Sequence, residues 1–249
     1  MSGANPAELP ISAADNSRQY LVTGASGLLG NNLVRALLAI GAQVRVLTRA
    51  SSDPRPLAGL AVERFEGDIR NSAEVHQACD GVDVVLHAAG HVHIGWSGQD
   101  LHHSINVLGT QNIATAARQA KARLVHVSSV NALGLGQLNN PATEETALPG
   151  VIPCPYVVSK KKAEDVVLAE IRQGLSAVIV NASFMLGAWD WKPSSGRMLL
   201  QLATKFVPFA PWGAYSVGDV RDVSQAILVA ANAPALRHDR YILAGHNLT

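Results

Sequence analysis

Two residues with spacing suited to acid–base chemistry, Tyr156 and Lys160, lie four positions apart in the segment YVVSK. On a helix, side chains four positions apart lie on the same face. A lysine ammonium beside a phenol favours the phenolate, so it lowers the phenol pKa from its ordinary value of about 10. A tyrosine with such a pKa can act as a general acid or base near neutral pH. By itself the pair is a weak signal, because this spacing also occurs by chance on helix surfaces.

Two serines, Ser128 and Ser129, provide a third group for this chemistry. They follow the apolar residues 123–127 (RLVHV), which predict a strand. Parallel sheets bind ligands at the carboxyl ends of their strands. A serine at this position could therefore hydrogen-bond the substrate oxygen that exchanges a proton with Tyr156. The alternative is that both serines only cap the end of the strand.

A second chemical feature is the glycine-rich stretch TGASGLLG at residues 23–30, between a predicted strand and a predicted helix. One glycine allows a tight turn, one lets the backbone approach a pyrophosphate, and one lets the helix pack closely on the strand. The N–H groups at the start of the helix can then bind phosphate. A glycine-rich turn without a ligand is the alternative, but the position before a series of βα units favours dinucleotide binding. The residues predicted to form this cofactor site are Gly24, Ala25, Ser26, Gly27, Leu28, Leu29 and Gly30.

The end of the second predicted strand distinguishes between two cofactors. An NAD site has a carboxylate there for the ribose 2′-hydroxyl, but this chain has VLTRASS and no acidic residue before Asp53. The guanidinium of Arg49 could hold a 2′-phosphate with two hydrogen bonds. We therefore expect NADP(H) to be preferred, with NAD(H) as the alternative. After the third strand, Asp68 could accept a hydrogen bond from the adenine amino group, or it could cap a helix.

Short apolar segments that alternate with amphipathic ones must position these groups. We predict strands at residues 20–23, 43–47, 62–65, 83–87, 123–127, 177–181 and 240–243. We predict helices at residues 28–40, 72–79, 101–121, 156–172, 198–206 and 222–231. Strands that are apolar throughout and separated by helices indicate parallel pairing with both faces covered. The expected fold class is therefore α/β, with a doubly wound parallel sheet.

The same pattern predicts three parts of the chain. Residues 1–18 are expected to form a mobile leader, because their small and polar residues show no periodicity. Residues 19–185 are expected to form the dinucleotide-binding domain. Residues 186–249 are expected to form a partial substrate domain, shortened at its C-terminal end. Its stretch 188–197 is rich in Trp, Pro, Ser and Gly, which predicts a lid-like loop.

Composition excludes several classes of protein. Of the 249 residues, 48% are hydrophobic and 16% are charged, with a formal net charge of +1. These values exclude a disordered chain and give no electrostatic reason to expect nucleic acid or an acidic membrane as a partner. No apolar run reaches the ~18–20 residues of a membrane span, and the first residues lack a secretion signal, so we expect a cytoplasmic protein. Two cysteines provide neither a disulfide framework nor a zinc pattern.

The motifs occur together in the order found in one enzyme family. The chain resembles the extended short-chain dehydrogenases/reductases of the NAD(P)-dependent epimerase/dehydratase superfamily, which implies a Rossmann fold. The resemblance rests on TGASGLLG (23–30), GDI (67–69), HAAG (87–90), INVLGTQNI (105–113), VSSV (127–130) and YVVSK (156–160). Further stretches resemble the dihydroflavonol-4-reductase-like branch and bacterial relatives named hopanoid-associated sugar epimerases. These are VRVLTR (44–49), GAWDWKPSSGRM (187–198), SVGDVRDV (216–223) and RYILAGHNLT (240–249).

This resemblance implies roles for the matching residues. It makes Tyr156 the catalytic acid/base, Lys160 the residue that lowers its pKa and holds the nicotinamide ribose, and Ser129 the catalytic serine in preference to Ser128. Asn106 matches the asparagine that helps to organise the site. The cofactor contacts implied beyond the glycine motif are Arg49, Asp68, Ile69, Ala88, Ala89, Gly90, Asn181 and Ser183. The family usually has proline at the positions of Ala182 and Ala188, which puts the rigidity of the nicotinamide-side loop in doubt.

Candidates for substrate contact lie in the segments that follow the strands. His91, His93 and Trp96 come after the fourth strand, where this fold places loops that face the substrate. Asn131 and Met185 are further candidates, and core packing is their alternative. The four histidines between residues 91 and 103 have no spacing that fits a metal site and no Cys, Asp or Glu to complete one, so we predict no metal.

The combined pattern predicts an NADP(H)-dependent oxidoreductase that reduces a ketone or aldehyde, or oxidises a secondary alcohol, by hydride transfer. Two alternatives remain: an NAD(P)-dependent nucleotide-sugar epimerase or dehydratase that uses the same groups, or a non-catalytic dinucleotide-binding sensor if the short C-terminal part prevents turnover. The expected partner is a small-molecule carbonyl, alcohol or nucleotide sugar. No nucleic acid or membrane partner is expected. From the resemblance we also expect a homodimer that pairs through the helices at 101–121 and 156–172.

Overall fold

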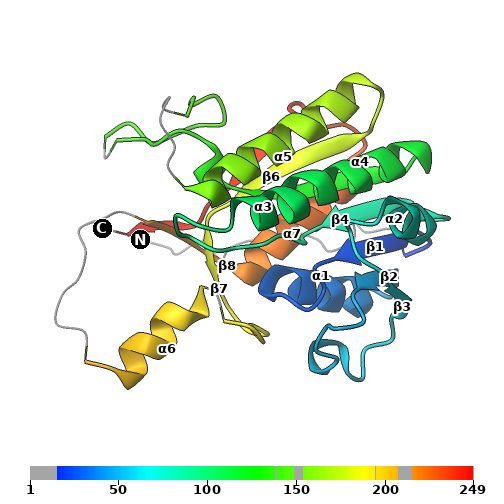
Figure 1. The fold of residues 1–249 in the computed structure, drawn as a ribbon, viewed down its shortest axis with the longest axis horizontal. Helices are drawn as coiled ribbons and strands as arrows, with labels where there is room; N and C mark the ends of the chain where they lie inside the picture. Colours follow the sequence, from blue (N-terminus) through cyan, green and yellow to red (C-terminus); the bar gives the residue numbers. More distant parts are fainter. Residues whose placement is uncertain (1–15, 138, 149–153, 194, 207–214, 249) are drawn as a thin grey trace, which may run out of the picture.

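The computed structural model describes residues 16–137, 139–148, 154–193, 195–206 and 215–248. These residues contain a seven-stranded sheet with the order β3-β2-β1-β4-β5-β6-β9, in which neighbouring strands are parallel (Figure 1). The sheet confirms the predicted α/β class and the doubly wound parallel arrangement. Its strands are β1 (Gln19–Thr23), β2 (Gln43–Thr48), β3 (Glu63–Glu66), β4 (Val84–His87), β5 (Arg123–Ser129), β6 (Ala177–Ala182) and β9 (Arg240–Leu243).

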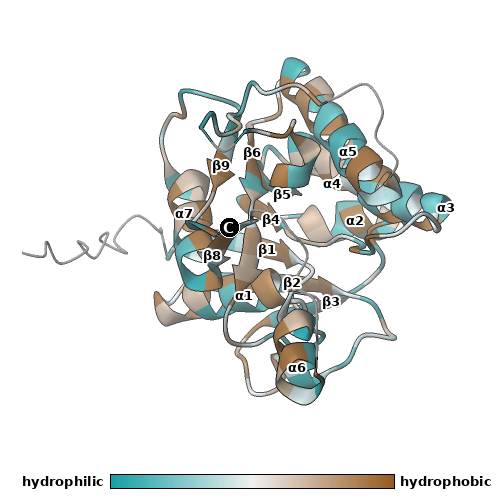
Figure 2. Cartoon of the chain, turned by 90° about the vertical axis from the view of Figure 1, so that its left-hand side faces the viewer, coloured by the Kyte–Doolittle hydropathy of each residue, from teal (hydrophilic) through white to brown (hydrophobic). Residues whose placement is uncertain are grey.

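Helices cover both faces of this sheet, and Figure 2 shows the two layers on either side of the strands. One face carries α1 (Leu28–Ala39) and α7 (Val220–Asn232). The other face carries α2 (Ser72–Cys79), α4 (Gly109–Gln119) and α5 (Pro155–Arg172). Because both faces are buried, the inner strands have runs of successive apolar residues instead of a regular alternation between apolar and polar residues.

Alternate side chains of β5 reach different layers, because successive residues of a strand point to opposite faces. Val125 and Val127 pack in the core under α1 and α7, while Leu124 packs in the core under α4 and α5. His126 and Ser128 share the side of Leu124 and are also buried. The strand thus carries polar side chains into the layer between the sheet and α5.

The helix predicted at residues 101–121 has an interruption. It consists of α3 (Gln99–His102), the π-helical turn η3 (His103–Leu108) and α4. Single π-helical turns widen a helix and often occur at functional sites. Here the wide turn contains Asn106, whose side chain is buried and hydrogen-bonded outside its own helix.

The C-terminal elements contribute to the central sheet and to one of its helix layers. Within residues 186–249, which we expected to form a partial substrate domain, α7 lies against α1, and β9 pairs with β6 as an edge strand of the central sheet. The reason is that α7 has an apolar face, including Val223 and Ile227, which it buries in the same core as α1. The division at residue 185 therefore stays a prediction, and residues on both sides of it build one sheet.

A smaller sheet lies beside the central one. Its order is β10-β8-β7, from β7 (Phe184–Leu186), β8 (Tyr215–Asp219) and β10 (His246–Leu248). These short strands were not predicted, because β8 and β10 lack an apolar run and β7 is only three residues long. The predicted helix at 198–206 is confirmed as α6 (Gly196–Thr204), which lies apart from the central sheet in Figure 1 and buries none of its residues.

Two predicted segments lie at the ends of the described ranges. The proposed leader lies mostly in residues 1–15, which are outside the described residues. The start of the proposed lid-like loop is held against α1, because Asn32 donates a hydrogen bond to the Ala188 carbonyl (2.9 Å) and Arg35 lies 3.4 Å from the centre of the Trp189 ring. None of the described helices combines the length and the apolar character that crossing a membrane requires.

Candidate active site

The glycine-rich turn lies between β1 and α1 at the carboxyl edge of the sheet. Gly24 has φ +71°, in the left-handed region that favours glycine, and a Cβ there would lie 2.7 Å from the Ala89 nitrogen. A Cβ at Gly30 would overlap the carbonyl oxygen of Gly24. The N–H of Gly27 donates to that same oxygen at 2.9 Å. All three glycines therefore serve a turn that brings α1, β1 and the segment after β4 into close contact.

This turn fits the pyrophosphate of a dinucleotide. Gly27 is the N-cap of α1, with no side-chain cap, and the first turn of the helix has no acidic residue. The N–H groups at this end have no partner within the helix and can bind an anion. The buried side chain of Asn31 donates to the carbonyls of Ala25 (3.2 Å) and Pro56 (2.8 Å), which fixes the turn. Ala25 and Leu29 bury their side chains, so their main chain would make the contact.

At the end of β2, Arg49 is exposed, and its guanidinium forms no hydrogen bond or ion pair with another described residue. Its positive charge acts on Asp68, whose pKa is lowered, mainly by a hydrogen bond from Arg70. The Asp68 carboxylate is thus already paired with Arg70 at 2.6 Å. Asp53, the first acidic residue after β2, is paired with Arg55 at 2.7 Å. Of these side chains, Arg49 is the one left available for a ligand.

The segment Ala88–Gly90 joins the two halves of the site. Its first two residues lie against Gly24, as the clash with a Cβ there demonstrates. At its other end, a Cβ on Gly90 would lie 3.4 Å from both Lys160 Nζ and Asn106 Oδ1. This short segment therefore places the glycine turn next to the residues predicted to be catalytic.

A chain of buried hydrogen bonds supports this segment. The N–H of Ala89 donates to Thr23 Oγ1 (3.2 Å), and Thr23 lies 2.7 Å from Nδ1 of His87. Nε2 of His87 lies 3.0 Å from Thr110 Oγ1, which itself donates to the Asn106 carbonyl (2.6 Å). Because Thr110 uses its hydrogen on Asn106, His87 must donate from Nε2 and accept at Nδ1. Burial lowers the pKa of His87 to about 3, helped by the charge of Lys160, so the ring is neutral.

Asn106 organises the loop that follows Gly90. Its Oδ1 accepts from the N–H of His91 (2.7 Å), and its Nδ2 donates to the His91 carbonyl (3.0 Å) and to Ser159 Oγ (2.9 Å). Ser159 in turn donates to the carbonyl of Tyr156 at 2.7 Å. The predicted site residue Asn106 thus connects the loop after β4 to the first turn of α5. Ser159 was not among the predicted residues, although it lies inside the motif YVVSK.

Tyr156, in the first turn of α5, lies near Ser129, the last residue of β5. Tyr156 is 7% exposed, and its phenol lies near enough to Ser129 for the two groups to interact. Burial raises the pKa of Tyr156, and the interaction with Ser129 opposes the rise. We expected Lys160 to lower this pKa; in the structure desolvation decides the direction. Ser129 also accepts a hydrogen bond from the N–H of Asn131 at 3.2 Å, which orients its hydroxyl.

Lys160 is buried one helical turn after Tyr156. Its Nζ donates to the carbonyl of Val127 at 3.0 Å, on the strand that leads to Ser129. Burial lowers the pKa of Lys160 to about 8, and the charge of Glu164 opposes this effect. The spacing in the sequence therefore places the lysine correctly on the helix, with its ammonium against β5.

Several predicted residues have other surroundings. Asn181 is fully buried, and its amide donates to the Ser129 carbonyl (2.9 Å) and to Glu164 (2.6 Å), so it supports β5 from within the sheet layer. Ser183 is buried at the end of β6, and Met185 packs partly against the core under α1 and α7. Ile69 accepts a hydrogen bond from Asn112 and packs against α4.

The loop after β4 is the most exposed part of the site. The His91 ring packs on the buried His102 ring (4.6 Å between centres), which lies edge-on to Tyr156 at 6.0 Å. His93 and Trp96 are exposed, Trp96 by 81%. The described residues contain no group of three His, Cys, Asp or Glu side chains that could hold a metal ion.

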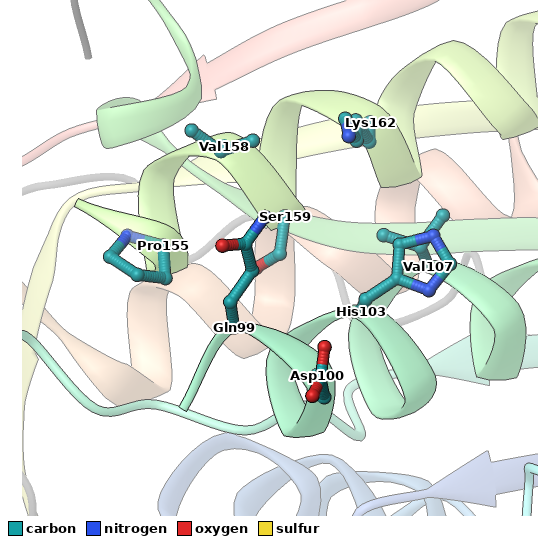
Figure 3. Close-up of a pocket in the computed structure, with 8 residues that line it drawn as sticks. All are labelled: Gln99, Asp100, His103, Val107, Pro155, Val158, Ser159 and Lys162. Carbon is teal, nitrogen blue, oxygen red and sulfur yellow. The ribbon is translucent and has the colours of Figure 1, made fainter. Parts of the chain in front are cut away.

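A separate hollow of about 380 Å³ lies between α3, η3 and α5 (Figure 3). Its lining includes Asp100, His103 and Lys162, on faces of the helices that point away from the sheet. It touches Ser159 but neither Tyr156 nor Lys160. These elements belong to the predicted helices 101–121 and 156–172, through which we expected a homodimer to form.

Comparisons with known proteins agree with this geometry. Residues 20–244 match the model of the family described as NAD dependent epimerase/dehydratase. The chain is 38% identical to sterol demethylase protein B of Methylococcus capsulatus (92% of this chain, 70% of that protein). It is 36% identical to a putative dihydroflavonol 4-reductase of Synechocystis (92% and 68%).

Among solved structures, the crystal structure of gox2253 is similar with a TM-score of 0.84 and 33% identity. The match covers 93% of this chain and 71% of that one. The motif order, the parallel sheet and these matches agree on one assignment. The chain belongs to the NAD-dependent epimerase/dehydratase family of enzymes, within which it resembles the dihydroflavonol-4-reductase-like branch.

Proposed function

We propose that this protein is a dinucleotide-dependent reductase of a ketone or aldehyde, with Ser129, Tyr156 and Lys160 as its catalytic residues. The observation that carries the proposal is the contact of Ala88–Gly90 with the glycine turn at one end and with Lys160 at the other. A dinucleotide whose pyrophosphate lies on the glycine turn would extend along this segment toward Tyr156. When bound, its reduced nicotinamide supplies the hydride.

The protonation states favour reduction. Because burial raises the pKa of Tyr156, its phenol is protonated at neutral pH and can donate a proton to the oxygen of a carbonyl that accepts hydride. Ser129, which interacts with this phenol, would hold the same oxygen. The buried Lys160 ammonium stabilises the negative charge that remains on Tyr156 after the transfer. Oxidation of an alcohol requires the reverse, with Tyr156 starting as the phenolate.

We further propose NADP(H) as the preferred cofactor. The support is the exposed Arg49 at the end of β2, together with the pairing of Asp53 with Arg55. A carboxylate held by an arginine is a poor acceptor for the 2′-hydroxyl of NAD(H), whereas a free guanidinium fits a 2′-phosphate.

The substrate that fits best has its carbonyl on an apolar body. Ile94 and Trp96 follow β4 with 74% and 81% exposure, and Leu135 follows β5 with 87% exposure. These side chains leave the same sheet edge as Ser129 and offer apolar contact area. The names of two relatives, a sterol demethylase protein and a dihydroflavonol reductase, agree with a bulky cyclic substrate.

An epimerase acting on nucleotide sugars is the second candidate, because epimerases are part of the family description and one similar solved structure is a UDP-glucose 4-epimerase. It would use Tyr156 and Lys160 with transient oxidation and no net use of cofactor. A homodimer through α3, η3 and α5 is also proposed, supported by the outward position of Leu101 and Leu108, each more than 40% exposed.

The test is turnover of reduced NADP with a panel of cyclic apolar ketones, and separately with UDP-glucose. We expect loss of reduced-nicotinamide absorbance with at least one ketone. Tyr156→Phe should lower the rate by about 10²–10⁴-fold while the protein still binds the cofactor. Sugar epimerisation without net absorbance change would establish the second candidate. If the protein binds the cofactor but catalyses neither reaction, the catalytic proposal is wrong and only a dinucleotide-binding role remains.

A further inference from the structure

A buried carboxylate lies next to the catalytic residues without belonging to their motif. Glu164 is fully buried on α5, one turn after Lys160. Its Oε2 accepts a hydrogen bond from Nη2 of Arg240 at 2.7 Å, and its Oε1 accepts one from Nδ2 of Asn181 at 2.6 Å. An isolated buried charge costs several kcal/mol, so a carboxylate at this position requires such partners.

The partners of Glu164 connect it to the catalytic strand. The same Nδ2 of Asn181 donates its second hydrogen to the carbonyl of Ser129 at 2.9 Å. Asn181 lies on β6 opposite Ser128, so its amide reaches the last residues of β5 from the neighbouring strand. A continuous path of hydrogen bonds thus runs from Glu164 to the backbone of Ser129.

The other end of the path is fixed to β9. Nη1 of Arg240 donates to the main-chain carbonyl of Glu144 at 3.1 Å, and the Glu144 carboxylate accepts from the N–H of Ile242 at 2.9 Å. Arg240 is therefore held from two sides, and its position on Glu164 follows from the pairing of β9 with β6.

We propose that Glu164 is a positioning residue, which holds Ser129 in place through Asn181 and places a buried carboxylate one helical turn from Lys160. This inference rests on the proposed catalytic use of Ser129 and Lys160. Glu164 touches neither substrate nor cofactor in this proposal, and acts through the two residues that do.

The surroundings of Lys160 make Glu164 the source of the compensating charge. On α5, Tyr156 is protonated and Glu164 is negative; from β4 and β5, the rings of His87 and His126 face Lys160 and are neutral, because burial lowers the pKa of both. Burial alone favours a neutral lysine, and Glu164 is the one group among these that favours the ammonium. Arg240 shares the charge of Glu164 and limits its effect on Lys160.

The test uses Glu164→Gln, which keeps the shape and an acceptor for Asn181 but removes the charge. The Nζ titration of Lys160 is followed by NMR in the cofactor-free protein, with its signal assigned by Lys160→Met. We expect the pKa of Lys160 to fall by about one unit in Glu164→Gln. This readout does not depend on turnover, so it stays valid if the proposed reaction is wrong.

Two further variants separate the two effects. In Asn181→Ala, the link to Ser129 is lost while Glu164 keeps its charge, so we expect kcat with the ketone substrate to fall about 10-fold or more and the Lys160 titration to stay close to that of the wild type. In Arg240→Gln, Glu164 loses its ion pair with Arg240. Its negative charge then acts more strongly on Lys160, so the pKa of Lys160 should rise. This variant keeps the proposal testable if Glu164→Gln does not fold.

Glu170 provides a matched control on the same helix. It is also buried and paired with an arginine, Arg118, at 2.6 Å, but on the side of α5 that faces α4. Glu170→Gln should lower stability without moving the Lys160 titration or kcat. If Glu164→Gln behaves in the same way as Glu170→Gln, Glu164 is only a structural ion-pair partner and the proposal is wrong.

Discussion

The hydroxyl of Thr23 lies 2.7 Å from Nδ1 of His87, and this contact ties the end of β1 to the end of β4 inside the core. The neutral ring passes the connection on to Thr110 and, through it, to the backbone of Asn106. The turn that fits the pyrophosphate and the helix turn that organises the proposed catalytic groups are thus joined by buried side chains. Because Nδ1 of His87 accepts the hydrogen bond from Thr23, protonation of this nitrogen would break the chain.

The first prediction concerns acid stability. The pKa of His87 falls from 6.5 to about 3 on folding, and burial also lowers that of His126. As the pH falls below 6.5, the unfolded chain takes up protons that the folded chain refuses, so the free energy of unfolding should fall by up to about 1.4 kcal/mol per pH unit for each ring. Urea unfolding between pH 7 and 4.5 measures this slope.

The variant His126→Leu separates the contributions of His126 and His87 to the loss of stability in acid. Neither ring nitrogen of His126 has a hydrogen-bond partner among the residues that the structure describes, so an apolar side chain should fit better. We expect the free energy of unfolding at pH 7 to rise by about 1–2 kcal/mol, and the acid slope to be reduced by the share of one ring. An unchanged slope would contradict the assignment of this ring as buried and neutral.

The second prediction compares two glycines that have similar positive φ angles. Gly24 has φ +71° and Gly41 has φ +76°, but a Cβ at Gly41 would meet no atom of the described residues within 4 Å, whereas at Gly24 it would meet Ala88 and Ala89. Gly41→Ala should therefore cost only about 1 kcal/mol of backbone strain and leave cofactor affinity unchanged. Gly24→Ala should cost more and should weaken cofactor binding, measured by calorimetry, by at least about 10-fold. Equal effects of the two substitutions would argue against a close approach at Gly24.

The third prediction addresses the choice of cofactor. Arg49→Ala should weaken binding of NADP(H) by about 10–100-fold, because one charge-assisted contact contributes about 1.5–3 kcal/mol. Binding of NAD(H) should change by less than about 2-fold, since it has no 2′-phosphate. Arg55→Ala is the control, because Arg55 is engaged with Asp53; releasing that carboxylate should leave NADP(H) affinity nearly unchanged or lower it slightly. A loss of equal size for both dinucleotides in Arg49→Ala would refute the NADP(H) proposal.

The fourth prediction is that Lys160 lowers the stability of the protein while it is needed for activity. Folding lowers the pKa of Lys160 from 10.5 to about 8, so at pH 7 the buried ammonium destabilises the protein. Lys160→Met should raise the free energy of unfolding by about 2–3 kcal/mol at pH 7, less the cost of the hydrogen bond to Val127. This gain should shrink as the pH rises from 8 and vanish above 10.5, where the lysine is neutral in both states. Turnover should fall at the same time; a variant that is both active and more stable would contradict the role of Lys160.

Much of the fold could be predicted from the sequence. Apolar runs and amphipathic segments predicted the strands and helices of the central layers, because a parallel sheet buried on both faces requires apolar strands. The helix predicted at 72–79 has the observed bounds of α2, and the strand predicted at 240–243 those of β9. The pattern failed where hydrogen bonds to distant residues decide local structure, as in the π-helical turn around Asn106 and the short strands β7, β8 and β10.

The sequence alone thus determined the family, the parallel sheet and the four-residue spacing of Tyr156 and Lys160, since each of these follows from local pattern. Only the tertiary structure decided the electrostatics of that pair. Burial raises the pKa of Tyr156 against the expected direction, and the pairing of β9 with β6 brings Arg240 to Glu164, 76 positions away in the chain. Desolvation and long-range contacts depend on what the fold encloses, and the spacing of residues along a chain carries no information about either.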